Sequence, residues 1–367
     1  MITRDVLNES WRDIDFSDFY RDRLSRPTEA DASADSHCIC TIPQLDVERH
    51  LLVNGFGNRT LHITKNHVDT PVQIQSVVNM DRKAHIELPL EIIIDPGTHV
   101  RLIHCDDTVG HYRSLSDNTV HITIGRDAVV EYYKLQNIND QSGLINRTFV
   151  VMQDGADLTM GCFTLNGGHI CNHAEVRMLG PHCHLRADGL YLLDHDQRCD
   201  NYIFVEHAHH NCVSEALYKG IIDDQARAQF NGHVLVQEGA FKSEASQTNR
   251  NILLTDKAHV ESKPFLEIYN DDVKCSHGAT TGQMDTEALL YMQTRGISER
   301  VARTMLSYAF CDEVVQHIGI KSLREAVSTM VKKRLHGELT PCSECALQCD
   351  APCNGPNVNF NIDVDKL

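Results

Sequence analysis

The stretch VHITIGRDAVVEYY, residues 120–133, decides the fold class of this chain. Val120, Ile122 and Ile124 alternate with polar residues, which is the period of a strand with one buried face. A tight polar turn follows, and the alternation resumes directly after it. The stretch therefore predicts two short strands joined by a tight turn.

The same phrase recurs along the chain. Matching turns read DPGTHVRL from residue 95, GRDAVVEY from 125, QDGADLTM from 153, QEGAFKSE from 237 and TDKAHVES from 255. Recurrence of one strand–turn unit every ~15 to 30 residues favours a coiled array of short strands, a β-solenoid. A β-sandwich explains the density of strands equally well. Helical periodicity is almost absent from residues 51–269, which argues against an α/β fold.

After residue 282 the pattern changes to that of helices. Asp285 is placed to cap one helix and Ser298 a second, while Ser322 and Glu325 form a capping box for a third. The second helix is expected to bury a stripe of Ala302, Met305, Leu306, Ala309 and Phe310, and the third one of Leu323, Val327, Met330 and Val331. These stripes are typical of packing surfaces.

Four regions follow from these patterns. Residues 1–50 are predicted to form an N-terminal segment with a short helix and a flexible linker, and residues 51–270 the β core. Residues 271–340 are assigned to a small helical domain, and residues 341–367 to a cysteine-rich tail.

Charge and composition limit the classes of partner. The chain has 34 Lys and Arg against 51 Asp and Glu, a net charge of −17, which disfavours binding to a phosphate backbone. No run of 18 apolar residues indicates a membrane span, and the charged N-terminus does not resemble a secretory signal. With 14 cysteines, these features predict a reducing, cytoplasmic location.

Two groups of residues are candidate metal ligands. Cys275 and His277 are two positions apart, so in an extended segment both point to one face and can address one metal ion or partner. The tail carries four thiols, which could hold zinc or an iron–sulfur cluster: Cys342, Cys345, Cys349 and Cys353. Their spacing matches neither the paired zinc pattern nor the ferredoxin run, so a tail that binds metal only adventitiously is an equal alternative.

Histidines beside cysteines at 104–105, 169–173, 182–184 and 207–212 are interpreted more simply. Buried cysteine behaves as a small apolar residue, and the histidines are expected to be exposed.

The sequence from 218 to 297, which contains KCSHGAT and ends in TRGI, resembles the SufB/SufD family of scaffold subunits of the SUF iron–sulfur cluster machinery. HLLVNG near residue 50 matches as well, and the resemblance runs from about residue 50 to 335. It implies a right-handed parallel β-helix followed by a C-terminal helical domain. It also implies two partners, the SufC ATPase docked on the helical domain and the paralogue SufB.

Within the family, the sequence resembles the SufD branch. SufB proteins carry a glutamate after the histidine and a scaffold cysteine about 27 residues earlier. This chain has Gly278 in place of the glutamate and reads QTNRN around Asn249, without a thiol. The resemblance therefore implies that the principal cluster-building residues lie on the partner. The short N-terminal segment and the cysteine-rich tail depart from the family pattern.

The resemblance gives Cys275 and His277 a role as ligands that complete a site shared with SufB. The simpler alternative is that they close the last turn of the β-helix. Tyr291, Arg295 and Arg303 are candidates for contacting the ATPase, with solvated helix faces as the alternative. The sequence has no phosphate-binding GxxxxGK[ST] loop, so ATP is expected to bind the partner.

The resulting prediction is a non-catalytic scaffold in an ATP-dependent complex, without a tightly bound cofactor and handling only transient iron or a cluster. The chain could pair with SufB or with a second copy of itself. One rival is a self-sufficient metal or iron–sulfur carrier that uses the tail cysteines. A second rival, an exported β-helical carbohydrate-active enzyme, is disfavoured by the cysteine content and the helical C-terminus.

Overall fold

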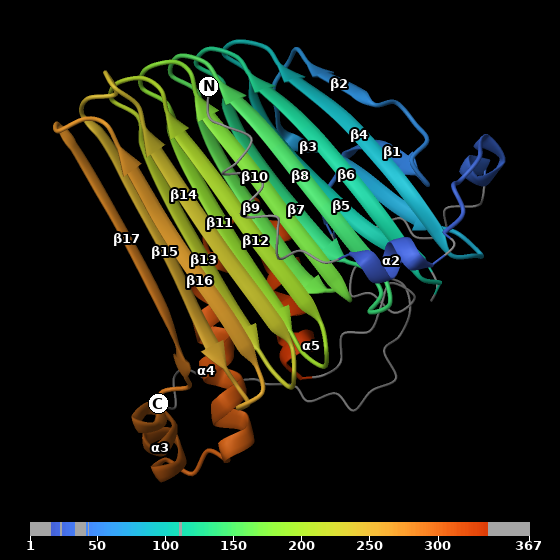
Figure 1. The fold of residues 1–367 in the computed structure, drawn as a ribbon, viewed down its shortest axis with the longest axis vertical. Helices are drawn as coiled ribbons and strands as arrows, with labels where there is room; N and C mark the ends of the chain where they lie inside the picture. The colour runs from blue at the N-terminus through green and yellow to red at the C-terminus, as the bar shows by residue number, and fades with distance from the viewer. Residues whose placement is uncertain (1–15, 23, 34–41, 43, 110–111, 337–367) are drawn as a thin grey trace.

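The computed structural model describes residues 16–22, 24–33, 42, 44–109 and 112–336. Within these ranges all the paired strands run parallel in two sheets (Figure 1). The nine-stranded sheet contains β1 Glu48–Val53, β3 His67–Asn79, β5 His99–Val109, β7 Val129–Asn137, β9 Asp157–Asn166, β11 His184–Leu193, β13 Val213–Ile222, β15 Ser243–Leu253 and β17 Val273–Gln283. The eight-stranded sheet contains β2 Thr60–Ile63, β4 Ala84–Ile94, β6 Ser114–Ile124, β8 Gly143–Met152, β10 His169–Met178, β12 Arg198–His207, β14 Arg227–Val236 and β16 His259–Ile268.

The chain alternates between the two sheets, so every strand pairs with the strand two places further along the sequence. Arg101 on β5 bonds Glu131 on β7 at 2.7 Å, and the 30 residues between them make one coil. The predicted β-solenoid is thus confirmed, and the sandwich alternative is excluded because neighbouring strands are parallel and separated by a full coil.

The interior lies between the sheets and follows the predicted alternation. Ile86, Val130 and Leu158 are fully buried there. The turn phrases lie at the corners, where Asp127, for example, takes a φ of 54°. A small residue follows because the corner leaves room for little else, as at Ala128, which is completely buried.

The interior also holds a charged group that the alternation does not predict. The Lys134 ammonium lies 3.2 Å from Asp106 and 2.5 Å from the Asn146 side-chain oxygen. Asn118 donates to the same Asp106 carboxylate at 2.8 Å. Burial raises the pKa of Asp106, and Lys134 opposes that shift. Such a group is tolerated inside because it is paired and hydrogen-bonded.

Each sheet also has an outer face that is partly covered. On the eight-stranded sheet, Phe16 and Phe19 of the short helix α2 (Ser17–Arg21) pack on Leu115, Ile145 and Cys171. A 3-10 turn, η1 (Glu29–Ser33), follows α2. On the nine-stranded sheet, helices α4 (Glu299–Val315) and α5 (Lys321–Leu335) form a second apolar cluster with strands β5 to β13.

The helices begin largely where the sequence predicts. Asp285 caps α3 (Thr286–Thr294) by accepting from two backbone amides, and Ser298 caps α4 by accepting from Val301. The capping box for the third helix is wrong. Its N-cap is Ile320, without a side-chain cap, because α5 starts at Lys321 and places Ser322 inside the first turn.

The predicted stripe of α5 is buried as expected, but that of α4 is only partly right. Ala302 is buried, whereas Ala309 is exposed. The buried face of α4 consists of Ala302, Ser307, Cys311, Val314 and Val315. The helix is rotated from the predicted face because Cys311, Val314 and Val315 meet the sheet directly.

The last strand, β17, lies wholly beyond residue 270, where the sequence placed the end of the β core. β17 runs from Val273 to Gln283 because each of its residues pairs with β15. The C-terminal helices therefore start at Thr286. Among the described residues, no helix is long and apolar enough to span a membrane.

Candidate functional site

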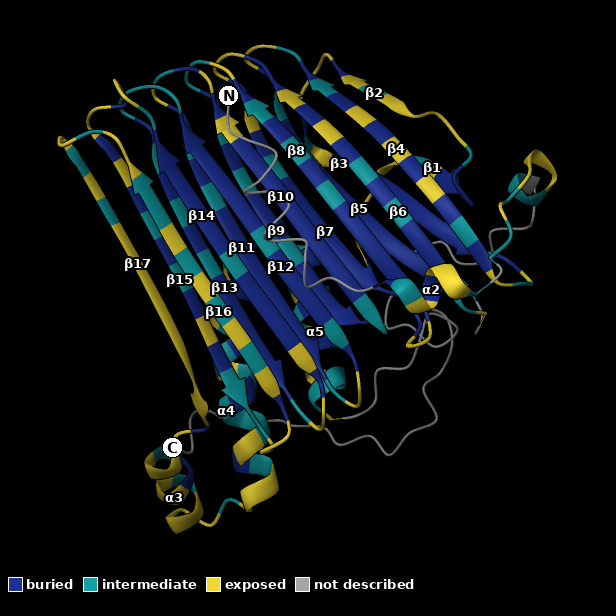
Figure 2. Ribbon diagram, in the orientation of Figure 1, coloured by how far each residue is buried: buried dark blue, intermediate teal, exposed yellow. Residues whose placement is uncertain are grey.

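β17 is the candidate site that follows from the sequence. It stands last in the order of the nine-stranded sheet, so only its edge toward β15 is paired in the described chain. Most of its residues are exposed, as the colouring in Figure 2 shows. An exposed edge strand presents unpaired backbone groups that can bind another strand.

Cys275 and His277 lie on the same face of β17, opposite Ala245 and Gln247 of β15. Cys275 is half-buried and packs against the solenoid core, whereas His277 is exposed. Burial raises the pKa of the Cys275 thiol, so a metal that binds it must displace a proton. At Gly278, nothing described would come within 4 Å of an added Cβ, so the strand has open space on the face opposite to that of Cys275 and His277.

These two residues do not make a complete metal site. No group of three or more His, Cys, Asp or Glu is arranged to hold a metal ion anywhere in the described part of the chain. Iron–sulfur clusters and structural zinc ions usually take four protein ligands. A site at β17 would therefore need further ligands from outside these residues. The tail candidates Cys342, Cys345, Cys349 and Cys353 lie outside the described residues.

The predicted ATPase contacts fall at two separate places. On α3, Tyr291 is 60% exposed, and the Arg295 guanidinium lies 5.2 Å from its ring centre and bonds its hydroxyl at 3.2 Å. Leu290 next to Tyr291 is 61% exposed, so α3 presents two large apolar side chains to solvent. Arg303 is on α4, where it pairs with Glu299 at 2.9 Å.

A groove between α4 and α5 was not predicted. It has a volume of about 450 Å³ and is lined by Arg300, Val301, Thr304, Met305, Tyr308, Ala309, Lys332 and His336. Its floor is apolar and its rim is basic, with Lys332 lying 4.7 Å from the Tyr308 ring. The sequence assigned Met305 and Ala309 to the packing stripe, so the signal was present but was attributed to the core.

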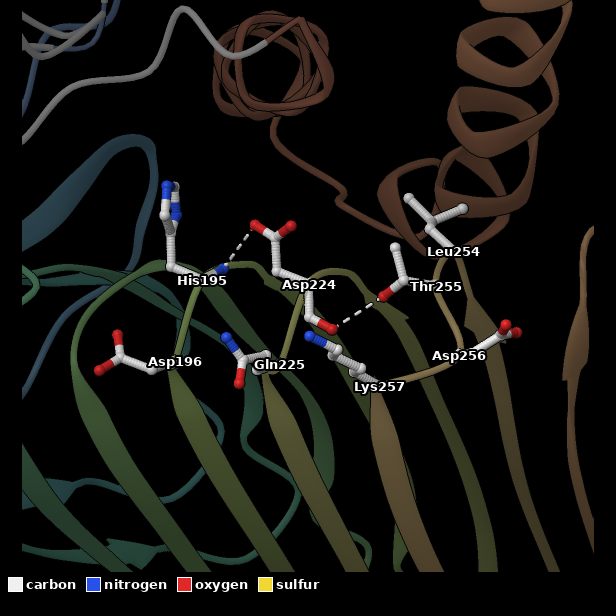
Figure 3. Close-up of a pocket in the computed structure, with 8 residues that line it drawn as sticks. All are labelled: His195, Asp196, Asp224, Gln225, Leu254, Thr255, Asp256 and Lys257. Carbon is white, nitrogen blue, oxygen red and sulfur yellow. Dashed lines mark hydrogen bonds between the residues drawn. The ribbon is translucent and has the colours of Figure 1, made fainter.

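A second, larger hollow lies at the corners of the later coils (Figure 3). It has a volume of about 840 Å³ and opens between turns that carry His195, Asp224 and Thr255. The His195 amide donates to the Asp224 carboxylate at 3.0 Å, and the Thr255 hydroxyl donates to the Asp224 carbonyl at 2.8 Å. These bonds join successive turns, so we interpret this hollow as structural.

The fold and the helical module define a class of protein, a parallel β-solenoid with an open edge strand and a docked C-terminal helical module. The family model for the SufBD core domain of SUF system FeS cluster assembly matches residues 79–310. The chain therefore belongs to the SufBD family.

Curated relatives agree with this family. Iron–sulfur cluster assembly protein SufD of Escherichia coli is 32% identical over 235 residues, which cover 62% of this chain and 56% of that protein. SufD of Bacillus subtilis is 25% identical over 296 residues, or 77% of this chain and 65% of that protein. A SufBD family protein of Mycobacterium tuberculosis is 29% identical over 268 residues, 70% and 58% of the two chains. The chain thus spans about half to two thirds of the length of these relatives.

Proposed function

We propose that this protein is a non-catalytic scaffold subunit that works in ATP-dependent iron–sulfur cluster assembly. In this proposal a SufB-type paralogue pairs with the open edge of β17, and a SufC-type ATPase docks on the helical module. Iron or a nascent cluster is cargo at the β17 interface. Membership of the SufBD family supports the role, and the exposed edge with Cys275 and His277 is the observation that carries it.

The incomplete ligand set supports a shared site. Cys275 and His277 offer one thiolate and one imidazole on one face of an open edge. A strand added there would bring its own side chains beside them, since neighbouring strands lie ~4.8 Å apart. Loosening such an interface would open the coordination shell, which suits a cluster that must leave.

The helical module is fixed firmly enough to transmit motion to the solenoid. Lys219 of β13 donates to the Phe310 carbonyl at 2.9 Å and pairs with Glu313. The Gly319 amide donates to the Tyr133 hydroxyl at 2.8 Å. A shift applied at the groove between α4 and α5 would therefore move the nine-stranded sheet with it.

Native mass spectrometry of the complex tests the proposal. The chain is co-expressed with the SufB and SufC proteins of the same source and purified under argon. We expect one copy of this chain with one SufB and two ATPase subunits. A lone chain that carries iron and passes it to an acceptor would instead support the carrier, and a lone metal-free chain would contradict both.

The first prediction concerns His277. Because this side chain is exposed, His277→Ala should fold normally yet lower the cluster content of the complex several-fold. Iron and sulfide are measured per complex after anaerobic purification. His259→Ala is the matched control, since His259 is exposed on the adjacent strand β16. Equal cluster content in all three proteins would exclude a ligand role for His277.

The carrier alternative rests on the four tail cysteines. A Cys345→Ser/Cys349→Ser variant removes two of the four thiols without touching β17. If this variant and the original chain carry equal metal, the tail holds no metal site.

A further inference from the structure

Cys183 and Cys212 occupy the same position on adjacent coils. Cys183 directly precedes β11 and Cys212 directly precedes β13, and the register pairs His184 with Val213. Both cysteines follow a corner residue with positive φ, His182 at 59° and Asn211 at 57°. In the described part of the chain, no other two cysteines are stacked in this way.

The same corner position holds small residues on the neighbouring coils. Ala156 occupies it one coil earlier and Ser243 one coil later. The position therefore tolerates small side chains of different chemistry, and a thiol is not required there for packing. Two thiols on consecutive coils thus call for another explanation.

The two sulfur atoms point to one place. Cys183 Sγ lies 3.3 Å and Cys212 Sγ 3.4 Å from the same acceptor, the Gly180 carbonyl oxygen. Each thiol has a second carbonyl acceptor as well, Gln153 at 3.2 Å for Cys183 and His210 at 3.7 Å for Cys212. Both side chains are buried and neither is in a disulfide.

The spacing suits a covalent link. Paired strands lie ~4.8 Å apart, and disulfides join residues whose Cα atoms are about 4.4–6.8 Å apart. The cross-link would need the two side chains to rotate away from the carbonyl groups that they now contact, with the backbone register kept.

We propose that Cys183 and Cys212 form an oxidisable dithiol, which a peroxide converts into a disulfide between adjacent coils. The site is independent of the scaffold role, because it lies at a corner of the solenoid and shares no residue with β17 or the helical groove.

The chemistry balances with hydrogen peroxide as the oxidant. The Cys212 thiolate attacks one peroxide oxygen, giving a sulfenic acid and releasing hydroxide. The Cys183 thiol then attacks the Cys212 sulfur, so the S–S bond forms and water leaves with the proton. Interaction between the two thiols lowers the pKa of Cys212 and raises that of Cys183, which favours Cys212 as the attacking thiolate.

Burial sets the rate of this reaction. Cys212 is 0% exposed, so peroxide must reach it through a loosened corner turn. Oxidation should therefore be slower than that of an exposed thiol, and it should reverse with dithiothreitol only after the same opening.

The test treats the full chain with hydrogen peroxide, alkylates the remaining thiols and maps the peptides by mass spectrometry. We expect a peptide that links Cys183 to Cys212 and has lost two hydrogens. The unfolding midpoint should rise by about 2–5 °C, because the link restricts the unfolded chain. Dithiothreitol should reverse both changes.

Serine variants show whether the disulfide forms at this pair of cysteines or at other thiols. Cys212→Ser copies the residue that Ser243 places at the same corner, and it should lose both the link and the rise in the midpoint. Cys311→Ser, which removes a buried thiol of α4, should keep both. The mapped peptide from the unsubstituted chain decides the question even if a variant folds poorly. Recovery of both cysteines as alkylated peptides, or links only to other cysteines, would overturn the proposal.

Discussion

A single carboxyl group, that of Asp188, shows how burial and pairing compete between the solenoid and the helices. Asp188 on β11 is buried, and its carboxylate lies 3.0 Å from Nδ1 of His317, just beyond the end of α4. Burial raises the pKa of Asp188 to about 6, although His317 and Arg186 both favour the charged form. Glu215 adds a smaller repulsion. Desolvation thus outweighs the nearby positive groups at this position.

A pH dependence follows from this shift. The folded pKa of about 6 exceeds the ordinary value of 3.8, so the folded protein binds the proton more tightly than the unfolded chain does. The contribution of Asp188 to stability is therefore full below about pH 4 and is lost as the pH rises through about 6. Relative to that of the original protein, the free energy of unfolding of Asp188→Asn should rise by about 2 kcal/mol between pH 4 and pH 7.

Urea unfolding of both proteins at the two pH values measures this difference. Titrating groups that do not interact with Asp188 cancel, because only the difference between variant and original protein is compared. A difference in unfolding free energy that does not change with pH would show that Asp188 keeps an ordinary pKa.

At the residue scale, the sequence predicted which face of a strand a residue lies on better than it predicted whether that residue is buried. Cys275 and His277 share a face of a strand as expected. His207 was expected to be exposed but is fully buried, and burial lowers its pKa to about 4. A histidine gives no sign of its burial in a local pattern, because an inward position in one coil depends on partners about 30 residues away.

At the scale of elements, Lys219 determines how α4 is held. Its ammonium is almost wholly buried, bonds the Phe310 carbonyl, pairs with Glu313 and lies 4.3 Å from the centre of the Phe310 ring. Arg334 of α5 makes a similar link to Asp194. The helical module therefore rests on the solenoid through a few charged contacts around an apolar patch.

Lys219→Ala should loosen α4 without unfolding the solenoid. Loss of these charge-assisted hydrogen bonds should cost about 2 kcal/mol, seen as faster amide hydrogen exchange in α4. Lys274→Ala is the control, since its pair with Glu244 is exposed to solvent and lies away from α4. Unchanged exchange in α4 would mean that the apolar patch alone holds the helix.

The sequence predicted that these helices exist but not which face each one buries. Apolar spacing on α4 marks two faces, one against the sheet and one lining the groove, and both contain aliphatic residues. Only the position of the sheet decides between them. α5 has a single apolar stripe, so its buried face was predictable.

At the scale of the whole molecule, the solenoid should be least stable at its two ends. Central strands such as β10 have two neighbours and are mostly buried, whereas β2 and β17 have one described neighbour each and are largely exposed. In a repeat protein each coil is stabilised mainly by its neighbours. Hydrogen exchange should therefore be fastest in the end strands β1, β2, β16 and β17, and slowest in β8 to β12.

Mass-resolved exchange on the isolated chain measures this gradient, and the assembled complex supplies the comparison. β17 should gain protection in the complex if a partner strand covers its edge. Uniform exchange along the solenoid would show that it unfolds as one cooperative unit.

The overall architecture was predictable because its turn phrases recur, as at residues 95, 125 and 153. The register was not predictable. Pairing of His169 with Gly143 on one side and Arg198 on the other depends on coil lengths that differ by a few residues. A slip of one residue would exchange the inward and outward faces.

Because one coil stacks on the next, the length of the solenoid is proportional to its number of coils. Each coil uses about 30 residues and advances the sheet by one strand spacing, ~4.8 Å. Deleting or duplicating a whole coil would shorten or lengthen the molecule by that step and leave the residues at both ends unchanged. The separation between the first coil and β17 is therefore set in discrete units, which an engineer could use to vary the reach of the molecule.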